Sequence, residues 1–351
     1  MSRLDTIFFG LLIFVPVALG AAWFSALSPI TVFILSALAL IPLAKFLSDA
    51  TEALADHVGP AAGGLLNATF GNAPELIIAI FALSAGLVDV VKASLIGSIL
   101  GNLLLGLGVA LFAGGLGRHK QEFNVTAARS NASTLLLAAT ALVLPALFFL
   151  SPGIPELTID HLSIAVSILL ILGYVATLIF ALVTHKHLYA TEPDGDAAAW
   201  SVMKALVILI ASTGAVVLVS DVLVGALEPL IATFGWPPLF VGAIVLALAG
   251  NAAEYLAAIR AAAGNKVLLS TQIALGSATQ IMLFVIPVIV IVSALVGHPM
   301  DLVFTIFELV AVVFAIFITN SIIEDGETNW LEGVLLFIVY CVIAVAFFFH
   351  P

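Results

Sequence analysis

The sequence predicts an all-α polytopic membrane protein with about 11 transmembrane helices, arranged as two inverted five-helix repeats plus one extra N-terminal helix. Three observations predict this fold class. Of the 351 residues, 63% are hydrophobic and only 9% are charged, whereas a soluble domain carries roughly 25% charged residues. Apolar stretches of about 20 residues, enough to cross a bilayer as a helix, recur from end to end. A five-residue motif also occurs twice, in segments expected to run in opposite directions.

Arg3 is the only basic residue before the first apolar stretch, and this stretch is long for a signal peptide. We therefore expect it to be retained as a helix. Several later stretches exceed the length a bilayer needs, which predicts tilted helices. The expected spans are 6–24, 29–55, 62–87, 91–115, 130–150, 160–183, 201–227, 236–262, 268–297, 301–321 and 329–349.

The ten Lys and Arg residues predict the orientation of the chain. Lys92 alone lies on the side opposite the N-terminus. The other nine lie on the N-terminal side: Arg3, Lys45, Arg118, Lys120, Arg129, Lys186, Lys204, Arg260 and Lys266. Because basic residues concentrate in cytoplasmic loops, we expect the N-terminus to lie in the cytoplasm. We also expect a multi-pass protein of a cell (inner) membrane. An odd number of spans then places the C-terminus outside.

The repeated motif is Gly71-Asn72-Ala73-Pro74-Glu75, which matches Gly250-Asn251-Ala252-Ala253-Glu254 at an offset of 179 residues. The same offset aligns Gly97-Ser98 with Gly276-Ser277 in the following helix. The first motif lies in a span expected to run outward and the second in one expected to run inward. The halves are therefore predicted to be inverted copies, as in many secondary transporters.

This repeat sets the expected organisation of the chain. An extra helix precedes the first repeat, and a cytoplasmic linker separates the two repeats. The boundaries are 1–27 for the extra helix, 28–183 for the first repeat, 184–200 for the linker and 201–351 for the second repeat.

Glu75 and Glu254 are the principal candidate site residues. A carboxylate inside a membrane is costly unless it is protonated, paired or hydrated, and neither helix offers a Lys or Arg at comparable depth. Each Glu can hold a proton, because burial disfavours the charged form, or both can face one divalent cation. Protons and metal would then compete for the same two groups. Alternating access between the halves would convert that competition into antiport.

The rest of the motif predicts further ligands. Asn72 and Asn251 precede the acids by three positions and share their helix faces. Their amide oxygens can add to the six to eight oxygens that Ca2+ takes, or their NH2 groups can orient the carboxylates. Gly71 and Gly250 loosen the helices there, which frees backbone carbonyls to line a pathway.

Polar positions in other helices are secondary candidates. Ser98 and Asn102 share a helix face, and so do Ser277 and Gln280, so we expect them to line the pathway. The alternative is that these small polar residues form interhelical hydrogen bonds. Two acids are less specific candidates: Glu52 for the entrance, against a solvated helix end, and Glu308 for a proton or cation pathway, against a structural hydrogen bond.

At these motifs the sequence resembles the Ca2+/H+ exchanger (cation/proton exchanger) family of the Ca2+/cation antiporter superfamily. The resemblance covers nearly the whole chain. The stretches that carry it are Pro42–Asp56, Gly63–Glu75, Gly97–Gly108, Gly250–Ile259, Gly276–Phe284 and Asp325–Gly333.

The resemblance implies that Glu75 and Glu254 are the Ca2+-binding and proton-exchanging acids, with Asn72 and Asn251 beside them. The family uses the proton gradient to expel Ca2+ from the cytoplasm. Asn at both positions, where Na+-coupled relatives carry hydroxyl residues, favours protons as the counter-ion. One departure is the linker, which has only three acids, Glu192, Asp194 and Asp196, where some relatives carry a long acidic run.

Other readings stay open at this point. A Na+-coupled or broader-specificity divalent cation exchanger could use the same fold, and an ion channel or a homo-oligomer is also compatible with the sequence. We expect Ca2+ and H+ as transported ions, the lipid bilayer as surroundings, no cofactor and, with a net charge of −11, no nucleic-acid partner. The sequence has neither a His-Glu-x-x-His nor a Gly-x-Ser-x-Gly motif, which disfavours an intramembrane enzyme.

Overall fold

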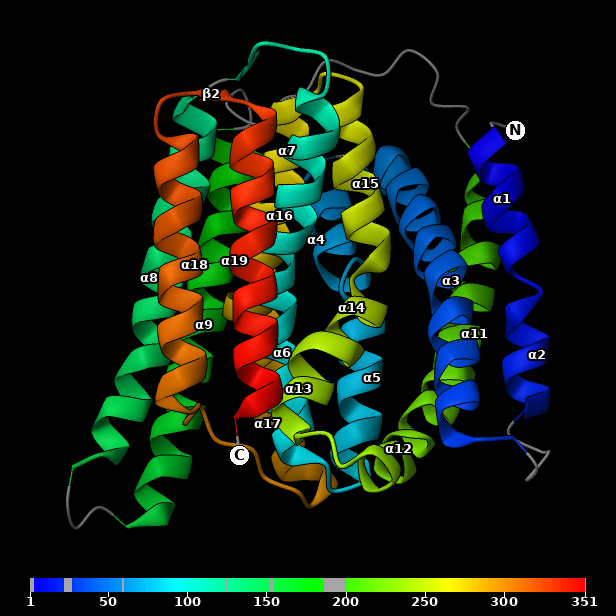
Figure 1. The fold of residues 1–351 in the computed structure, drawn as a ribbon, viewed down its shortest axis with the longest axis vertical. Coiled ribbons are helices and arrows are strands. Elements are labelled where there is room, and N and C mark those ends of the chain that lie inside the picture. Colours follow the sequence, from blue (N-terminus) through cyan, green and yellow to red (C-terminus); the bar gives the residue numbers. More distant parts are fainter. Residues whose placement is uncertain are drawn as a thin grey trace. The chain divides into compact units, whose positions relative to one another are not determined.

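Long apolar runs make this chain helical, because a backbone without water satisfies its hydrogen bonds most simply within a helix. The computed structural model is almost entirely helical (Figure 1). It describes residues 3–21, 27–58, 60–123, 125–151, 155–185 and 200–350. The three acids of the linker, Glu192, Asp194 and Asp196, lie outside the described residues.

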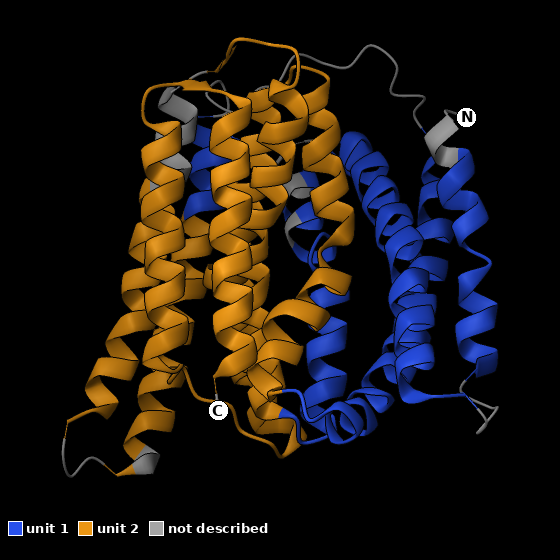
Figure 2. Cartoon of the chain, viewed as in Figure 1, with its two compact units in different colours: residues 1–87, 177–236 blue, residues 88–176, 237–351 orange. Residues whose placement is uncertain are grey.

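The chain divides into two compact units, residues 1–87 with 177–236 and residues 88–176 with 237–351 (Figure 2). In unit 1, α3 packs along α11, and α2 and α4 also contact α3. Unit 1 contains α1 (Arg3–Leu11), α2 (Phe14–Ala21), α3 (Pro29–Val58), α4 (Pro60–Phe70), α5 (Ala73–Ser84), the π-helix η2 (Phe180–Thr184), α11 (Val202–Gly225) and α12 (Leu227–Phe234).

Unit 2 is built around one continuous span, which is the most buried of the candidate membrane spans among the described residues. This span is α6 (Val88–Leu100), the π-helix η1 (Gly101–Gly106) and α7 (Leu107–Gly115). The other elements are β1 (Gln121–Glu122), α8 (Val125–Phe149), α9 (Glu156–Ile179), α13 (Pro238–Phe240), η3 (Val241–Leu246), α14 (Ala247–Gly250), α15 (Ala252–Ala263), α16 (Val267–Gln280), η4 (Ile281–Val285), α17 (Ile286–Val296), α18 (Ile306–Ile323), β2 (Glu327–Thr328) and α19 (Trp330–Phe349). The end of α9, from residue 177, belongs to unit 1.

Glycines allow the central span to touch its neighbours. A Cβ on Gly97 of α6 would lie 2.0 Å from the carbonyl oxygen of Ala243, and one on Gly242 would lie 2.5 Å from that of Val90. On the other side, a Cβ on Gly333 of α19 would lie 2.3 Å from a backbone nitrogen of α7. Small residues let helices approach closely in membranes, and here they bring backbones into contact on both sides of the span.

Three expected spans are interrupted in the structure. The first is divided into α1 and α2, which are separated at residues 12–13. The third is broken between α4 and α5 at Gly71-Asn72, and the eighth is bent by 59° between α14 and α15 at Asn251. Both motif copies therefore lie at breaks rather than inside continuous helices.

Two π-helices occupy nearly equivalent places in the expected repeats. η1 begins at Gly101 and η4 begins at Ile281, which is within one residue of the 179-residue offset. Each follows the helix that carries a Ser predicted to line the pathway, Ser98 in α6 and Ser277 in α16. A π-helix places hydrogen bonds five residues apart and often marks a functional site.

Within the described residues, seven helices are long and apolar enough to cross a membrane, or up to eight if the bent pair Pro238–Gly250 and Ala252–Ala263 is one span. Three shorter apolar helices, Thr6–Ala21, Ala73–Ser84 and Ser133–Phe149, fall in the remaining expected ranges. Several apolar helices thus agree with a multi-pass membrane protein.

Two short strands add to the predicted all-α architecture, which the nearly all-helical structure supports. β1 and β2 form a two-stranded antiparallel sheet, in which Gln121 pairs with Thr328 and Glu122 with Glu327. Gly326, in a turn with φ 77°, lets the chain reverse before β2. Strands of two residues are too short to give a sequence pattern.

Candidate functional site

Asn72 and Asn251 adopt the same backbone conformation at the two helix breaks. Each is the N-cap of the following helix, with φ −103° and ψ 17° at Asn72 and φ −96° and ψ 9° at Asn251. Glu75 and Glu254 therefore lie in the first turns of α5 and α15. The exposed N–H groups and dipole of a helix start favour a negative charge, so the breaks create suitable surroundings for these acids.

The motif residues divide between the two units. Gly71, Asn72 and Glu75 belong to unit 1, where Asn72 and Glu75 are buried. A Cβ on Gly71 would lie 2.5 Å from the carbonyl oxygen of Asn67, so the turn before Asn72 excludes any larger residue. All the other members of the predicted site, apart from Glu52, belong to unit 2.

Four buried polar residues of unit 2 form a hydrogen-bonded cluster, which we call the amide cluster: Ser98, Asn102, Asn251 and Ser277. Asn102 Nδ2 donates to Asn251 Oδ1 at 2.9 Å and to Ser277 Oγ at 3.0 Å. Asn251 Nδ2 donates to Ser98 Oγ at 2.8 Å. The cluster joins α6, η1, the α14–α15 break and α16, so the structure brings together four of the predicted site residues.

The Asn251 side chain makes three hydrogen bonds, two of them within this cluster. Its side-chain oxygen accepts from Asn102, and its nitrogen donates to Ser98 Oγ and to the carbonyl oxygen of Ala247 at 2.9 Å. The side chain is 0% exposed. The amide orientation is the one that this network requires. In this arrangement both N–H groups of the amide donate hydrogen bonds, and the oxygen, which accepts from Asn102, has a second lone pair that a cation could use.

Glu254 differs from the amide cluster because one of its oxygens has no partner. The side chain is half-buried, and its Oε2 atom is buried without a hydrogen bond among the described residues. A buried polar atom without a partner is costly and calls for a proton, a water or a cation. Glu254 therefore offers a buried oxygen that can take either a proton or a metal ion.

Gly250 and Gln280 mark the ends of helices in unit 2. Gly250 is the last residue of α14, immediately before Asn251, and Gln280 is the last residue of α16, immediately before η4. Among the described residues, no group of three or more His, Cys, Asp or Glu side chains gathers closely enough to hold a metal ion.

Glu308 has a structural partner. It lies in the first turn of α18, where its Oε2 accepts from the backbone nitrogen of Thr305 at 2.9 Å and from Thr305 Oγ1 at 2.8 Å. Thr305 Oγ1 in turn accepts from the Glu308 nitrogen, which completes a capping box. This geometry accounts for the burial of Glu308 without a pathway role. Glu52 has an exposed side chain on α3 of unit 1.

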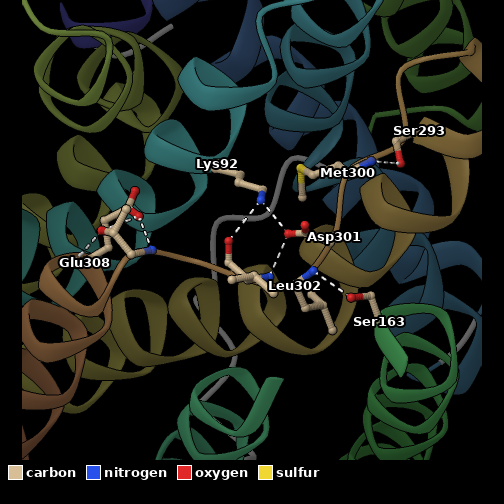
Figure 3. A network of polar contacts seen from close by, with 9 residues as sticks. Lys92, Ser163, Ser293, Met300, Asp301, Leu302 and Glu308 are labelled. Atoms are coloured by element: carbon tan, nitrogen blue, oxygen red, sulfur yellow. Dashed lines mark hydrogen bonds and ion pairs between the residues drawn. The ribbon is translucent and has the colours of Figure 1, made fainter. Parts of the chain in front are cut away.

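The loop before α18 is tied to several helices (Figure 3). Lys92 Nζ donates to Asp301 Oδ1 at 2.5 Å and to the Val303 carbonyl at 2.9 Å. Ser163 Oγ of α9 accepts from the Leu302 nitrogen at 2.9 Å. The helix expected over 301–321 therefore begins only at Ile306, because these contacts hold residues 301–303 in a non-helical conformation.

Tyr255 was not predicted as a site residue, yet it contacts η1 directly. A Cβ on Gly101 would lie 2.0 Å from the Tyr255 hydroxyl, and one on Gly106 would lie 2.6 Å from its ring. Tyr255 follows Glu254 and packs on the π-helix that begins beside Asn102. Its position next to the motif was the only sequence signal available.

Comparison with known proteins gives consistent matches over the whole chain. The model of the family described as sodium/calcium exchanger protein matches residues 28–183 and 204–349. A protein of Synechocystis sp. named Ca(2+)/H(+) antiporter is 46% identical over 370 residues, covering 100% of this chain and 99% of its own. The Ca(2+)/H(+) antiporter ChaA of Bacillus subtilis is 45% identical, over 88% of this chain and 89% of its own.

Among solved structures, native YfkE superposes with a TM-score of 0.85 at 40% identity, covering 98% of this chain and 100% of its own. A second structure of the same protein is described as a Ca2+/H+ antiporter.

Proposed function

This chain belongs to the sodium/calcium exchanger protein family, and we propose that it exchanges Ca2+ for H+ across a membrane by alternating access. It is a transporter rather than an enzyme, and Ca2+ is its cargo. The names of its near-full-length relatives support this function. The structural observation that carries the proposal is the buried, unpartnered Oε2 of Glu254 at the start of α15.

We propose further that Glu75 and Glu254 are the groups for which Ca2+ and protons compete. Two carboxylates balance one divalent ion, and the same two groups can each release or take up a proton. The equal conformations of Asn72 and Asn251 support equivalent roles for the two motif copies. Asn251 contributes by holding the α14–α15 break in place, through Asn102 and Ser98.

The two-repeat organisation and the orientation belong to the same proposal. The family model matches the chain twice, over 28–183 and 204–349, which supports two repeats separated by the linker. The seven long helices, the bent pair and the three shorter apolar helices together support about 11 spans. The nine-to-one distribution of basic residues supports a cytoplasmic N-terminus.

Everted membrane vesicles containing the protein test the proposal. An imposed pH gradient, acidic inside, should drive uptake of Ca2+ by the wild type. Uptake should disappear in Glu75→Gln and in Glu254→Gln, because a neutral amide can neither balance the cation nor exchange a proton. Glu228→Gln, which changes an exposed acid of α12, is the matched control and should transport normally.

A Na+ gradient applied to the same vesicles separates the remaining readings. Uptake that follows Na+ and ignores pH would contradict proton coupling and favour the Na+-coupled alternative. Normal uptake in either Gln variant would contradict the role of that Glu.

A further inference from the structure

The stretch Asp325–Gly333, which carries part of the family resemblance, lies outside the residues proposed to bind the transported ions. In the structure it packs with the loop after α7 at the end of unit 2 where α7 and α15 both end. We call residues 118–122 and 325–329 together the clasp. Its two strands β1 and β2 pair, and the Phe123 nitrogen donates to the Gly326 carbonyl at 2.9 Å.

Arg118 caps two helices at once. Its Nη1 donates to the carbonyl oxygen of Gly114 in the last turn of α7, and its Nη2 donates to that of Ala263 at the end of α15, at 3.2 Å. The last carbonyls of a helix have no partners within the helix, and a cation there also complements the helix dipole. Because the guanidinium presents donors on separate nitrogens in a fixed plane, it serves both helix ends at once, whereas the three donors of an ammonium all lie on one nitrogen.

Gln121 holds the same end of α15 from within the sheet. It is 3% exposed, and its Nε2 donates to the Ala262 carbonyl at 3.2 Å and to Asn265 Oδ1 at 2.8 Å. Asn265 takes the left-handed conformation, with φ 64°, just after the helix. A Cβ on Gly114 would lie 2.7 Å from the Ala262 carbonyl oxygen, so α7 and α15 meet without a gap here.

The other half of the clasp anchors this loop to α19. Asp325 Oδ1 accepts from the Glu327 nitrogen at 3.1 Å, which forms the turn before β2. Asn329 Oδ1 accepts from the nitrogens of Leu331 and Glu332 and so begins α19. The clasp therefore connects the ends of α7 and α15 to the start of α19.

The opposite ends of the same two spans carry the amide cluster. α15 has 12 residues and begins immediately after Asn251, and α7 continues without a break from η1, which contains Asn102. A helix transmits a displacement along its axis, because its backbone hydrogen bonds make it stiff. A shift between the ends of α7 and α15 at the clasp would therefore move Asn251 and Glu254 relative to Asn102.

We propose that Arg118 and Gln121 are positioning residues for the exchange reaction, which hold Glu254 and Asn251 in register with Asn102. This inference rests on the proposed function. The two residues do not contact the transported ions, and they act through the length of α15. Weakening the contacts of Arg118 and Gln121 with the end of α15 should therefore alter the affinity for Ca2+ and the competition with protons more than the maximal rate.

The test uses the purified full-length protein in proteoliposomes, with the initial rate of Ca2+ uptake measured against Ca2+ concentration at several pH values. In Arg118→Lys, which keeps the charge and loses the fork, we expect the KM for Ca2+ to rise about threefold to tenfold, the size of effect expected for the loss of one typical hydrogen bond. The pH of half-maximal inhibition should move with it, and the maximal rate should stay near that of the wild type. Gln121→Leu should shift KM in the same direction.

Lys120→Met is the control, since Lys120 is exposed and forms ion pairs with Glu122 and Glu327 rather than with α15. Hydrogen exchange gives a second measurement. Amides in the last turns of α15 should exchange faster in Arg118→Lys than in the wild type, and at the wild-type rate in Lys120→Met.

Unchanged KM and pH dependence in both Arg118→Lys and Gln121→Leu would overturn the inference. So would a loss confined to the yield of folded protein, or an equal KM shift in Lys120→Met. If the wild type shows no pH-driven uptake, the proposed function fails, and the exchange of the α15 amides alone then decides whether the clasp holds that helix.

Discussion

At the residue scale, Asn251 combines two tasks that the sequence motif alone did not separate. It ends one helix and begins the next, and its side chain joins α6 and η1 through Ser98 and Asn102. Its amide is buried with a partner at each end, so truncation would remove three hydrogen bonds and leave buried atoms such as Ser98 Oγ with fewer partners. A buried polar atom that loses its partner costs more free energy than the hydrogen bond itself contributed, because the atom stays dehydrated.

Asn251→Ala should abolish exchange and destabilise the protein by about 1–3 kcal/mol, the cost of leaving buried partners unsatisfied. Thermal unfolding in detergent and vesicle uptake measure the two effects. Thr271→Val is the matched control, since Thr271 is also buried and donates only to the Val267 carbonyl of its own helix. Normal transport by Asn251→Ala would contradict a role for the amide cluster.

Glu308 should behave as a cap rather than as a transport acid. Glu308→Gln keeps an acceptor oxygen for Thr305, so we expect its exchange activity to be near that of the wild type. Thr305→Ala removes the N-cap and should lower stability by about 1 kcal/mol. Uptake assays and thermal unfolding on both variants check this. Loss of exchange in Glu308→Gln with unchanged stability would support the pathway role instead.

The motif residues could be predicted because a five-residue pattern occurs twice in the sequence, and the same offset aligns residues of the following helix. The sequence predicted that Ser98, Asn102 and Ser277 line the pathway, with interhelical hydrogen bonds as the alternative, and the structure joins them to Asn251 in a hydrogen-bonded cluster. Sequence reasoning missed Arg118, Gln121 and Tyr255, because their contacts connect a loop or a π-helix to a distant helix. No periodic spacing in the sequence records such contacts.

At the scale of elements, equivalent glycines of the two expected repeats meet different surroundings. A Cβ on Gly97 would lie 2.0 Å from the Ala243 carbonyl oxygen, whereas one on Gly276 would meet no atom within 4 Å. The contact between α6 and η3 therefore depends on Gly97, and the equivalent position in α16 is open. The two expected repeats therefore share a pattern of residues without sharing every contact.

This difference gives a matched pair of substitutions. Gly97→Ala should destabilise the protein by more than about 1 kcal/mol, because a backbone carbonyl cannot move away as a side chain can. Gly276→Ala should be neutral or stabilise by up to about 1 kcal/mol through the better helix propensity of Ala. Thermal unfolding of the two purified variants measures both. Equal stability of the variants would contradict the close approach of α6 and η3.

The ion pairs of the clasp should not set the pH dependence of exchange. Hydrogen bonds to Glu122 and Glu327 raise the pKa of Lys120, and the hydrogen bond from Lys120 lowers the pKa of Glu122. The stabilisation from Glu122 is present above an ordinary carboxyl pKa of about 4.3 and is lost as the pH falls through its lowered value. The stabilisation from Lys120 is present below about 10.4 and is lost as the pH rises through its raised value.

Both groups therefore keep their charges throughout the neutral range. Lys120→Met should leave the pH profile of Ca2+ uptake unchanged between about pH 6 and about pH 8, well inside those limits. Proteoliposome uptake at a series of pH values measures the profile. A displaced midpoint would show that this pair takes part in proton coupling.

At the scale of the whole molecule, the two ends of unit 2 should face opposite sides of the membrane. Lys120 lies in the clasp at the end of α15, which precedes α16, whereas His298 follows α17 at the far end of the α16–η4–α17 span. In a Cys341→Ser background, Lys120→Cys should react with a membrane-impermeant thiol reagent only from the cytoplasmic side. His298→Cys should react only from outside. The reverse pattern would invert the proposed orientation, and equal labelling from one side would contradict the span itself.

The overall architecture was accessible from the sequence because membrane insertion imposes long apolar runs. The bend at Asn251, the start of α18 and the β1–β2 sheet were not accessible. Each depends on contacts between segments far apart in the chain: the hydrogen bond from Asn102 at the bend, those of Lys92 and Ser163 before α18, and the pairing of β1 with β2. Hydropathy reports where a helix can exist, and tertiary hydrogen bonds decide where it is interrupted.

The two π-helices have a consequence for the history of the chain. A π-helix holds more residues per turn than an α-helix, as an inserted residue would require, and η1 and η4 begin at almost the same place in the two expected repeats. Two halves descended from one duplicated gene would inherit such an insertion together. The extra residue would then be older than the duplication, and a present-day half-length relative should carry it too. A half-length relative with an uninterrupted α-helix at that place would reverse this order of events.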